Sequence, residues 1–185
     1  MTENGSKRRV IMVFNTSVVS ELFHVSILEK LKDYSNSVGH SIEYVLPDIV
    51  FNELKKDRII GKSEELLKQI FRILKTPEET LNELSVIRPS LGPGELSVLA
   101  TVSSLTQQNT QSSIIAIIDD KKGRKAAEEL GLERHGTLWI ILQLKANNII
   151  SKEKAVEIVM KLPYRGFHIS EKEIEKVIKK IKSDC

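Results

Sequence analysis

The chain has 185 residues and a single cysteine, Cys185, which is its last residue. One cysteine excludes an internal disulfide framework and a cluster of metal-binding thiolates. No apolar stretch approaches the roughly 20 residues that a membrane-spanning helix needs. The polar start, MTENGSKRR, lacks the apolar core of a signal peptide. We therefore expect a cytoplasmic protein.

Several catalytic motifs are also missing. The four histidines have no zinc-ligand spacing, and no motif of a nucleophilic serine or cysteine occurs. Gly61, Lys62 and Ser63 resemble the end of a phosphate-binding P-loop. That motif requires a glycine where this chain has Lys56, and no buried strand precedes it, so we reject a P-loop.

The composition is that of one ordinary globular domain, with 41% hydrophobic and 29% charged residues. The net charge of +3 is compatible with a nucleic-acid partner but too small to indicate one by itself. We find no internal repeat, no low-complexity segment and no clear domain boundary.

The segment from 113 to 130 is the most informative part of the chain. A continuous apolar run, Ile114 to Ile118, leads into Asp119 and Asp120, then into a basic turn with a glycine and a helix. An unbroken β-branched run is typical of a strand buried on both faces, which we expect as the central strand. A helix directly after it predicts a parallel α/β sheet, whose strand carboxyl ends are where ligand sites form.

Strands and helices alternate along the rest of the chain, with additional helices at the C-terminal end. The sequence predicts further strands at 9–14 and 42–46 and a weak one at 84–87, and a loop at 35–40. Apolar spacing predicts helices at 18–31 (broken near His24), 48–55, 62–74, after 76–79, from LGPGE to about 106, and at 122–130, 137–146, 151–161 and 170–182.

Oxygen-bearing side chains occur where such a fold forms its site. Asn15 follows the first strand, and Glu53 lies on the helix after the second strand. Glu95 lies in the turn after Gly92-Pro93-Gly94, and Asp119 and Asp120 follow the central strand. Clustered carboxylates bind Mg²⁺ or Mn²⁺ and can position a phosphodiester. Each residue also has an ordinary structural interpretation, as a helix cap, a first-turn acid, a turn residue or a solvated charge.

A basic group lies beside the acidic pair, at Lys121, Lys122, Arg124 and Lys125. It is either a solvated helix face or a surface that holds phosphates. Trp139, on an apolar helix, is expected in the core.

A set of segments in a fixed order carries a resemblance to a known family: VFNTSVVSEL at 13–22, LPDIVFNEL at 46–54, LGPGELSVLA at 91–100, IIDDKKGRKAAEELGL at 117–132, GTLWIILQLKANNII at 136–150 and LPYRGFHIS at 162–170. This order resembles the PIN-domain family of metal-dependent ribonucleases, especially a PIN-like subgroup from archaea and bacteria. The segments with LGPGE, with the aspartate pair and with GTL are the most specific.

The resemblance implies a three-layer α/β/α sandwich around a central parallel sheet. It places a PIN-like domain at 9–170, a flexible N-terminus at 1–8, and a C-terminal helix at 171–185 that packs on the domain or extends from it. Family activity is hydrolysis of single-stranded or loop RNA with Mg²⁺ or Mn²⁺. Many members are toxins of toxin–antitoxin pairs and form homodimers, so RNA, an antitoxin protein and a second copy are the expected partners.

The resemblance also assigns roles to residues. The acidic positions of the family fall on Asn15, Glu53, Glu95 and Asp120, with Asp119 next to the last. Glu53, Glu95 and Asp120 would hold the metal, assisted by Asn15 and Asp119. The expected RNA-binding residues are Thr16, Ser17, Lys121, Arg124 and Lys125.

Asn15 departs from the family pattern, because most active PIN nucleases have an aspartate there, although the subgroup also includes asparagine. An amide oxygen can bind a metal but adds no negative charge, which weakens divalent binding. An asparagine could also be an engineered change that silences the enzyme. Two interpretations follow: an active endoribonuclease, or a weakened PIN-like module that binds RNA or a protein without cutting. A phosphoacceptor receiver domain fits less well, since its acidic pair lies near the first strand.

Overall fold

The computed structural model describes residues 9–109, 111–165 and 169–183. The expected N-terminal segment 1–8 lies outside these residues, as do 166–168 of the LPYRGFHIS segment. Within the described part, no helix combines the length and the apolar character that crossing a membrane requires.

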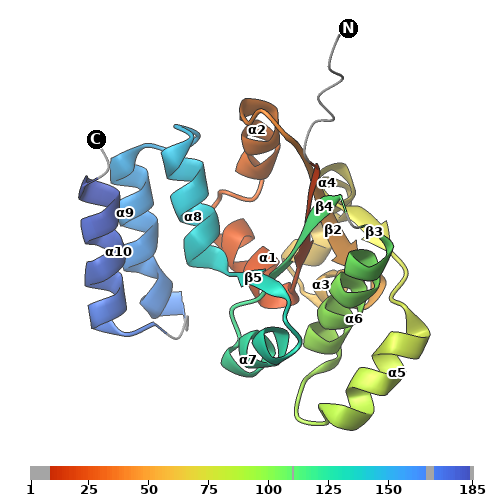
Figure 1. Ribbon diagram of the computed structural model, residues 1–185. Coiled ribbons are helices and arrows are strands. Elements are labelled where there is room, and N and C mark those ends of the chain that lie inside the picture. The colour runs from red at the N-terminus through yellow and green to blue at the C-terminus, as the bar shows by residue number, and fades with distance from the viewer. Residues whose placement is uncertain (1–8, 110, 166–168, 184–185) are drawn as a thin grey trace, which may run out of the picture.

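A parallel sheet of five strands forms the centre of the molecule, in the order β3-β2-β1-β4-β5 (Figure 1). The predicted α/β class with a central parallel sheet is therefore confirmed. β1 takes the middle position, and the strand that we expected at the centre is its neighbour β4. The strands are β1 (Arg9–Phe14), β2 (Ser41–Pro47), β3 (Arg72–Leu74), β4 (Ser112–Ile117) and β5 (Glu133–His135).

Helices connect successive strands and form the C-terminal end. Those before β4 are α1 (Thr16–His24), α2 (Lys30–Ser37), α3 (Asp48–Lys56), the short 3-10 helix η1 (Ile60–Ser63), α4 (Glu64–Ile70), α5 (Glu78–Ile87) and α6 (Pro93–Gln108). Those after it are α7 (Lys121–Glu129), α8 (Thr137–Ala146), α9 (Lys152–Lys161), the 3-10 helix η2 (Leu162–Arg165) and α10 (Glu171–Ser183).

The third strand was predicted in the wrong place. Residues 84–87 belong to α5, in which only Leu84 is buried. The helix predicted at 62–74 ends at Ile70, and the chain then becomes extended to form β3. A strand of three residues at a sheet edge is too short to show the alternation of apolar and polar residues that indicates a strand. Its apolar residues fit the spacing of the preceding helix instead, which is why the sequence predicts a helix there. The loop expected at 35–40 is shorter, because α2 continues to Ser37.

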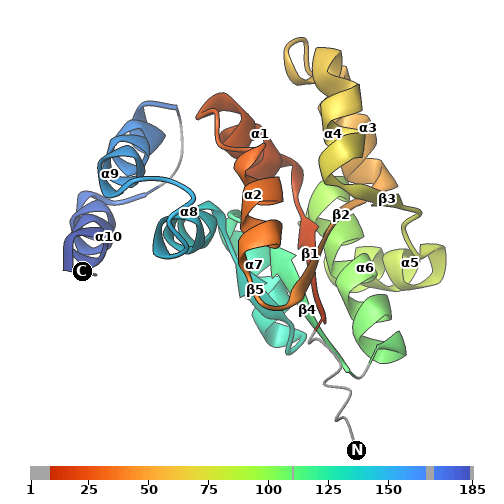
Figure 2. The same ribbon diagram turned by 90° about the horizontal axis from the view of Figure 1, so that it is seen from above.

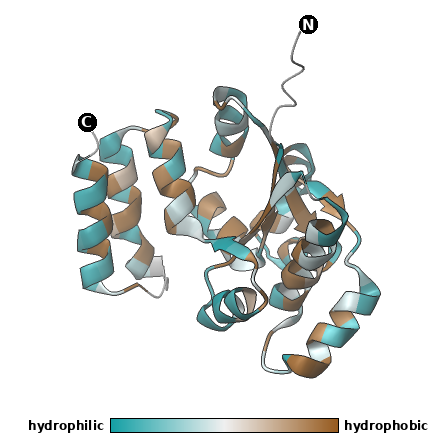
Figure 3. Cartoon of the chain, in the orientation of Figure 1, coloured by the Kyte–Doolittle hydropathy of each residue, from teal (hydrophilic) through white to brown (hydrophobic). Residues whose placement is uncertain are grey.

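The core forms around β1, whose residues from Val10 to Phe14 are all buried. Phe14 makes edge-to-face contacts with Tyr44 of β2 and with Phe71, at ring-centroid distances of 5.9 and 5.3 Å. α6 covers one face of the sheet and contacts β1, β2 and β4, whereas α1 and α2 lie on the other face (Figure 2). The strands between these layers are predominantly hydrophobic (Figure 3).

Three helices, α8, α9 and α10, stand side by side at one end of the molecule (Figure 1). α10 contacts both α8 and α9. Its apolar residues Ile174, Val177, Ile178 and Ile181 pack against the core.

The parallel register brings the carboxyl ends of the strands to one edge. Phe14, the last residue of β1, pairs with Ile117, the last residue of β4. The backbone N–H of Asn15 continues this ladder by donating to the carbonyl of Ile117 at 3.0 Å. Residues that follow β1, β2 and β4 therefore begin their helices on the same side of the sheet.

Asp48, the first residue of α3, connects that helix to the segment after β3 by hydrogen bonds. Its Oδ1 accepts hydrogen bonds from the backbone N–H groups of Ile49 and Thr76, at 3.0 and 2.9 Å, and from the Thr76 hydroxyl at 2.6 Å. Burial alone would raise the pKa of Asp48, but the hydrogen bonds from Thr76 and Ile49 outweigh it, and the pKa is lowered.

We predict that Asp48→Ala lowers the free energy of unfolding by about 1–3 kcal/mol, because the buried N–H of Thr76 loses its acceptor. Because the Asp48 pKa is lower in the folded state, its contribution is present above the unfolded value near 3.9 and is lost as pH falls through the folded value. Denaturant unfolding at neutral pH and below about pH 4 tests both expectations.

Asp33→Ala is the matched control, because Asp33 is exposed and forms a surface ion pair with Lys30. It should change the stability by less than about 1 kcal/mol. Equal effects of the two substitutions would contradict the role assigned to Asp48.

Candidate metal centre

Asn15 connects the start of α1 with the first turn of α6. It caps α1, and its Oδ1 accepts the backbone N–H of Thr16 at 2.7 Å. Its Nδ2 donates to Oε1 of Glu95 at 3.3 Å. Asn15 is only 2% exposed, so this amide is held in a fixed orientation by both contacts. Its oxygen lies close to Gly94, and its nitrogen points toward Glu95.

Glu53 reaches the same place from α3. The hydroxyl of Thr16 donates a short hydrogen bond to Oε2 of Glu53. Asn15 donates to Glu95, and the adjacent Thr16 donates to Glu53. The start of α1 is therefore hydrogen-bonded to both glutamates. The predicted residues Asn15, Thr16, Glu53 and Glu95 are therefore brought together.

Gly94 provides the space in which these groups meet. A methyl group on its Cα would lie 2.7 Å from Oε2 of Glu53 and 3.1 Å from Oδ1 of Asn15. Those two oxygens are thus within reach of one point beside the first turn of α6. We had not named Gly94 as a site residue; the sequence signal was its place directly before Glu95 in the LGPGE segment.

Asp120 approaches from the other side of Glu95. It is exposed and caps α7, with Oδ1 accepting the N–H of Gly123 at 2.9 Å. A methyl group on Gly123 would lie 3.3 Å from Cγ of Glu95 and 3.8 Å from Oδ1 of Asp120. Glu95 therefore lies between Asn15 and Asp120, and a second glycine permits the close approach.

Asp119 points elsewhere. Its two oxygens accept the backbone N–H and the hydroxyl of Thr137, at 2.8 and 2.5 Å. Burial raises the pKa of Asp119, although the hydrogen bonds from Thr137 act against this shift. A side chain on Gly136 would collide with the carboxylate. The structure thus separates the two aspartates: Asp120 lies beside Glu95, and Asp119 holds the N-terminus of α8.

The residues predicted to bind RNA lie near the N-terminal ends of α1 and α7, two helices that begin at the centre. Ser17 is exposed in the first turn of α1, and Lys121 is the exposed first residue of α7. The Nζ of Lys125 lies 3.8 Å from Oε1 of Glu129 in the same helix. Arg124 faces a neighbouring pocket that also contains Trp139.

The donor set suits a hard divalent cation, because all the candidate ligands offer oxygen. Gly94 leaves space beside the oxygens of Glu53 and Asn15 that a larger residue would fill. Among the described residues, no three acidic, histidine or cysteine side chains converge enough to hold an ion by themselves. The carboxylates of Glu53, Glu95 and Asp120 thus do not form an ion site by themselves, and Asn15 adds an oxygen close to Glu53.

The family comparison agrees with this geometry. The family DUF3368, described as a PIN domain, matches residues 11–183. The chain belongs to the PIN-domain family. The matched region starts in β1 and includes α10. Among curated proteins, no sequence matches the chain. PIN domains are nuclease-like modules that generally depend on divalent metals.

We predict that Gly94→Ala disables the site while leaving the fold intact. The added methyl group displaces the end of a flexible glutamate, so the free energy of unfolding should change by less than about 1 kcal/mol. Moving Glu53 away should slow any metal-dependent nuclease activity about a hundredfold, since a misplacement near 1 Å has effects of that size. Denaturant unfolding and a cleavage assay measure the two effects.

Gly39→Ala is the control, because a methyl group there would meet nothing within 4 Å. It should leave both stability and cleavage nearly unchanged. Full cleavage by the Gly94→Ala protein would contradict the position given to Glu53.

Proposed function

We propose that the protein is a divalent-metal-dependent endoribonuclease that cuts single-stranded or loop RNA. The observation that carries this proposal is that Asn15 lies beside Glu53 at Gly94 and donates to Glu95, while Glu95 and Asp120 both lie close to Gly123. Membership in the PIN-domain family supports nuclease chemistry at this place.

The ligands of Mg²⁺ or Mn²⁺ would be the carboxylates of Glu53, Glu95 and Asp120, with Oδ1 of Asn15 as a neutral fourth. When bound, such an ion offsets charge on a phosphodiester and makes a water molecule more acidic. The hydroxyl of Thr16 orients Glu53, and the amide nitrogen of Asn15 orients Glu95. These two hydrogen bonds hold the carboxylates in place before the ion and the RNA arrive.

The N-terminal part of α7 would bind the RNA backbone. Lys121 directly follows Asp120, and Arg124 lies about one helical turn further along the same helix. Both side chains can attract phosphates toward the carboxylates without reading the bases. Ser17, in the first turn of α1, and Lys125 would extend this surface.

We predict that Asp120→Asn lowers metal-dependent RNA cleavage by about a hundredfold or more, because it removes one ligand charge from the centre. Asparagine caps helices about as well as aspartate, so the acceptor for the N–H of Gly123 is retained and α7 should still form. Cleavage of a labelled single-stranded RNA, followed over a range of Mn²⁺ concentrations, measures the loss.

Glu83→Gln serves as the comparison, because Glu83 is an exposed residue of α5 and has no part in the centre. Its cleavage rate should equal that of the unchanged protein. Undiminished turnover by the Asp120→Asn protein would remove the basis of the nuclease proposal.

A second candidate function is a module that binds RNA or a protein without cutting. The observation that favours it is the hydrogen bond from the Asn15 amide to Glu95, which stabilises that carboxylate without a metal ion. Retention of RNA in EDTA, with no cleavage at any metal concentration, would support this function over the nuclease.

The proposal extends to a role as the toxin of a toxin–antitoxin pair, with an antitoxin partner and a homodimeric assembly. These three features rest on the family resemblance alone.

A further inference from the structure

A pocket of about 390 Å³ lies beside the acidic centre, between the β5–α8 segment and α10. Apolar side chains from both helices, Leu138, Leu142 and Val177, form part of its lining. Aromatic and basic side chains form most of the remainder. Of its lining residues, the function proposed above uses only Arg124.

Two aromatic rings are stacked in the pocket. The imidazole of His135 and the indole of Trp139 lie 4.2 Å apart between centroids, with an angle of 8° between their planes. Trp139 was expected in the core but is only partly buried, and the His135 side chain is 31% exposed. Burial lowers the pKa of His135, although the nearby Glu133 acts against this shift. The pair therefore offers a flat aromatic surface to a ligand.

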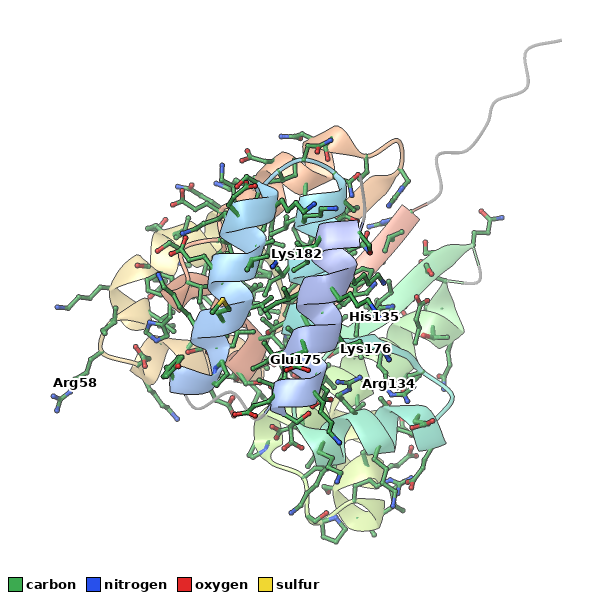
Figure 4. All side chains as sticks on the ribbon, turned by 90° about the vertical axis from the view of Figure 1, so that its left-hand side faces the viewer. Arg58, Arg134, His135, Glu175, Lys176 and Lys182 are labelled. Atoms are coloured by element: carbon green, nitrogen blue, oxygen red, sulfur yellow. The ribbon has the colours of Figure 1, made fainter. Side chains whose placement is uncertain are left out.

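The charges around the rings favour an anion. Arg124, Lys176 and Lys180 line the pocket, and within the described chain none of the three forms an ion pair. The lining also holds two carboxylates: Glu173 interacts electrostatically with Arg124 and Lys176, and Asp119 with Arg124, so three cations face two anions and the positive charge is in excess. Figure 4 shows Lys176 and His135 on the same side of α10.

The pocket and the acidic centre are linked by the first turn of α7. Arg124 lies about one helical turn after Asp120, and Asp119 belongs to the lining. A strand of RNA whose phosphate lies at Asp120 would place a neighbouring nucleotide close to Arg124. Aromatic stacking next to basic side chains is how proteins commonly hold single-stranded nucleic acid.

We propose that this pocket binds one nucleotide of a single-stranded RNA, with the base stacked on the Trp139–His135 pair and a phosphate held by Arg124 and Lys176. This inference rests on the proposed function for the kind of ligand, and it adds a subsite that fixes the position of the RNA beside the acidic centre.

The test uses the fluorescence of Trp139, which is the only tryptophan in the chain and so reports on this pocket alone. The full-length protein is titrated in EDTA with short oligouridylate and oligoadenylate, so that no metal-dependent cleavage interferes. We expect saturable quenching that weakens as salt increases. Oligoglutamate, an anion without bases, should give little quenching.

Variants separate the contributions of charge and stacking. Arg124→Gln or Lys176→Gln should reduce the slope of log affinity against log salt by about 0.7, the value for one phosphate contact on a single strand. Lys179→Gln, an exposed α10 residue outside the pocket lining, should keep the original slope. Trp139→Leu, measured by filter retention, should bind about tenfold more weakly.

The outcomes distinguish this proposal from the nuclease proposal. Unchanged Trp139 fluorescence at saturating RNA, or equal quenching by oligoglutamate, overturns the nucleotide subsite even if the protein cleaves RNA. Unchanged salt slopes in both the Arg124→Gln and the Lys176→Gln proteins overturn the phosphate contacts. Specific quenching in EDTA supports the subsite even if no cleavage is ever observed.

Discussion

The candidate centre depends on hydrogen bonds that join polar side chains at one edge of the sheet. Asn15, Glu53 and Glu95 come from three different parts of the chain: Asn15 and Glu53 meet where Gly94 has no side chain, and Asn15 donates to Glu95. Two of these groups are carboxylates, and two negative charges close together are unfavourable unless a positive charge or a hydrogen-bond donor compensates them. The amide nitrogen of Asn15 and the hydroxyl of Thr16 supply donors.

The fold explains why these residues meet. Parallel strands end at the same edge, so the helices after β1, β2 and β4 begin close to one another. α6 crosses the sheet from the opposite face and brings Glu95 to the same edge in its first turn. The close approach of α3 and α7 to α6 depends on Gly94 and Gly123: a side chain at Gly94 would meet Glu53, and one at Gly123 would meet Ile118 and then Glu95.

The sequence predicted the buried strands and the group of polar residues at their ends, because both leave local patterns. It did not predict β3, since three residues at a sheet edge form no pattern that differs from the end of a helix. The different roles of Asp119 and Asp120 were also not predictable, because they depend on Thr137, which lies 18 residues away. The sequence did not predict the Trp139–His135 stack as part of a pocket, because that pocket is completed by α10, an element distant in the sequence.

The most direct test of the metal centre is a calorimetric Mn²⁺ titration of the unchanged protein and of Asn15→Asp. If Asn15, Glu53, Glu95 and Asp120 share one ion, the added charge should tighten binding at least about tenfold. The same change places a carboxylate against Glu95 and should lower the melting temperature in EDTA. Equal Mn²⁺ affinities, or no binding by either protein, would contradict the account.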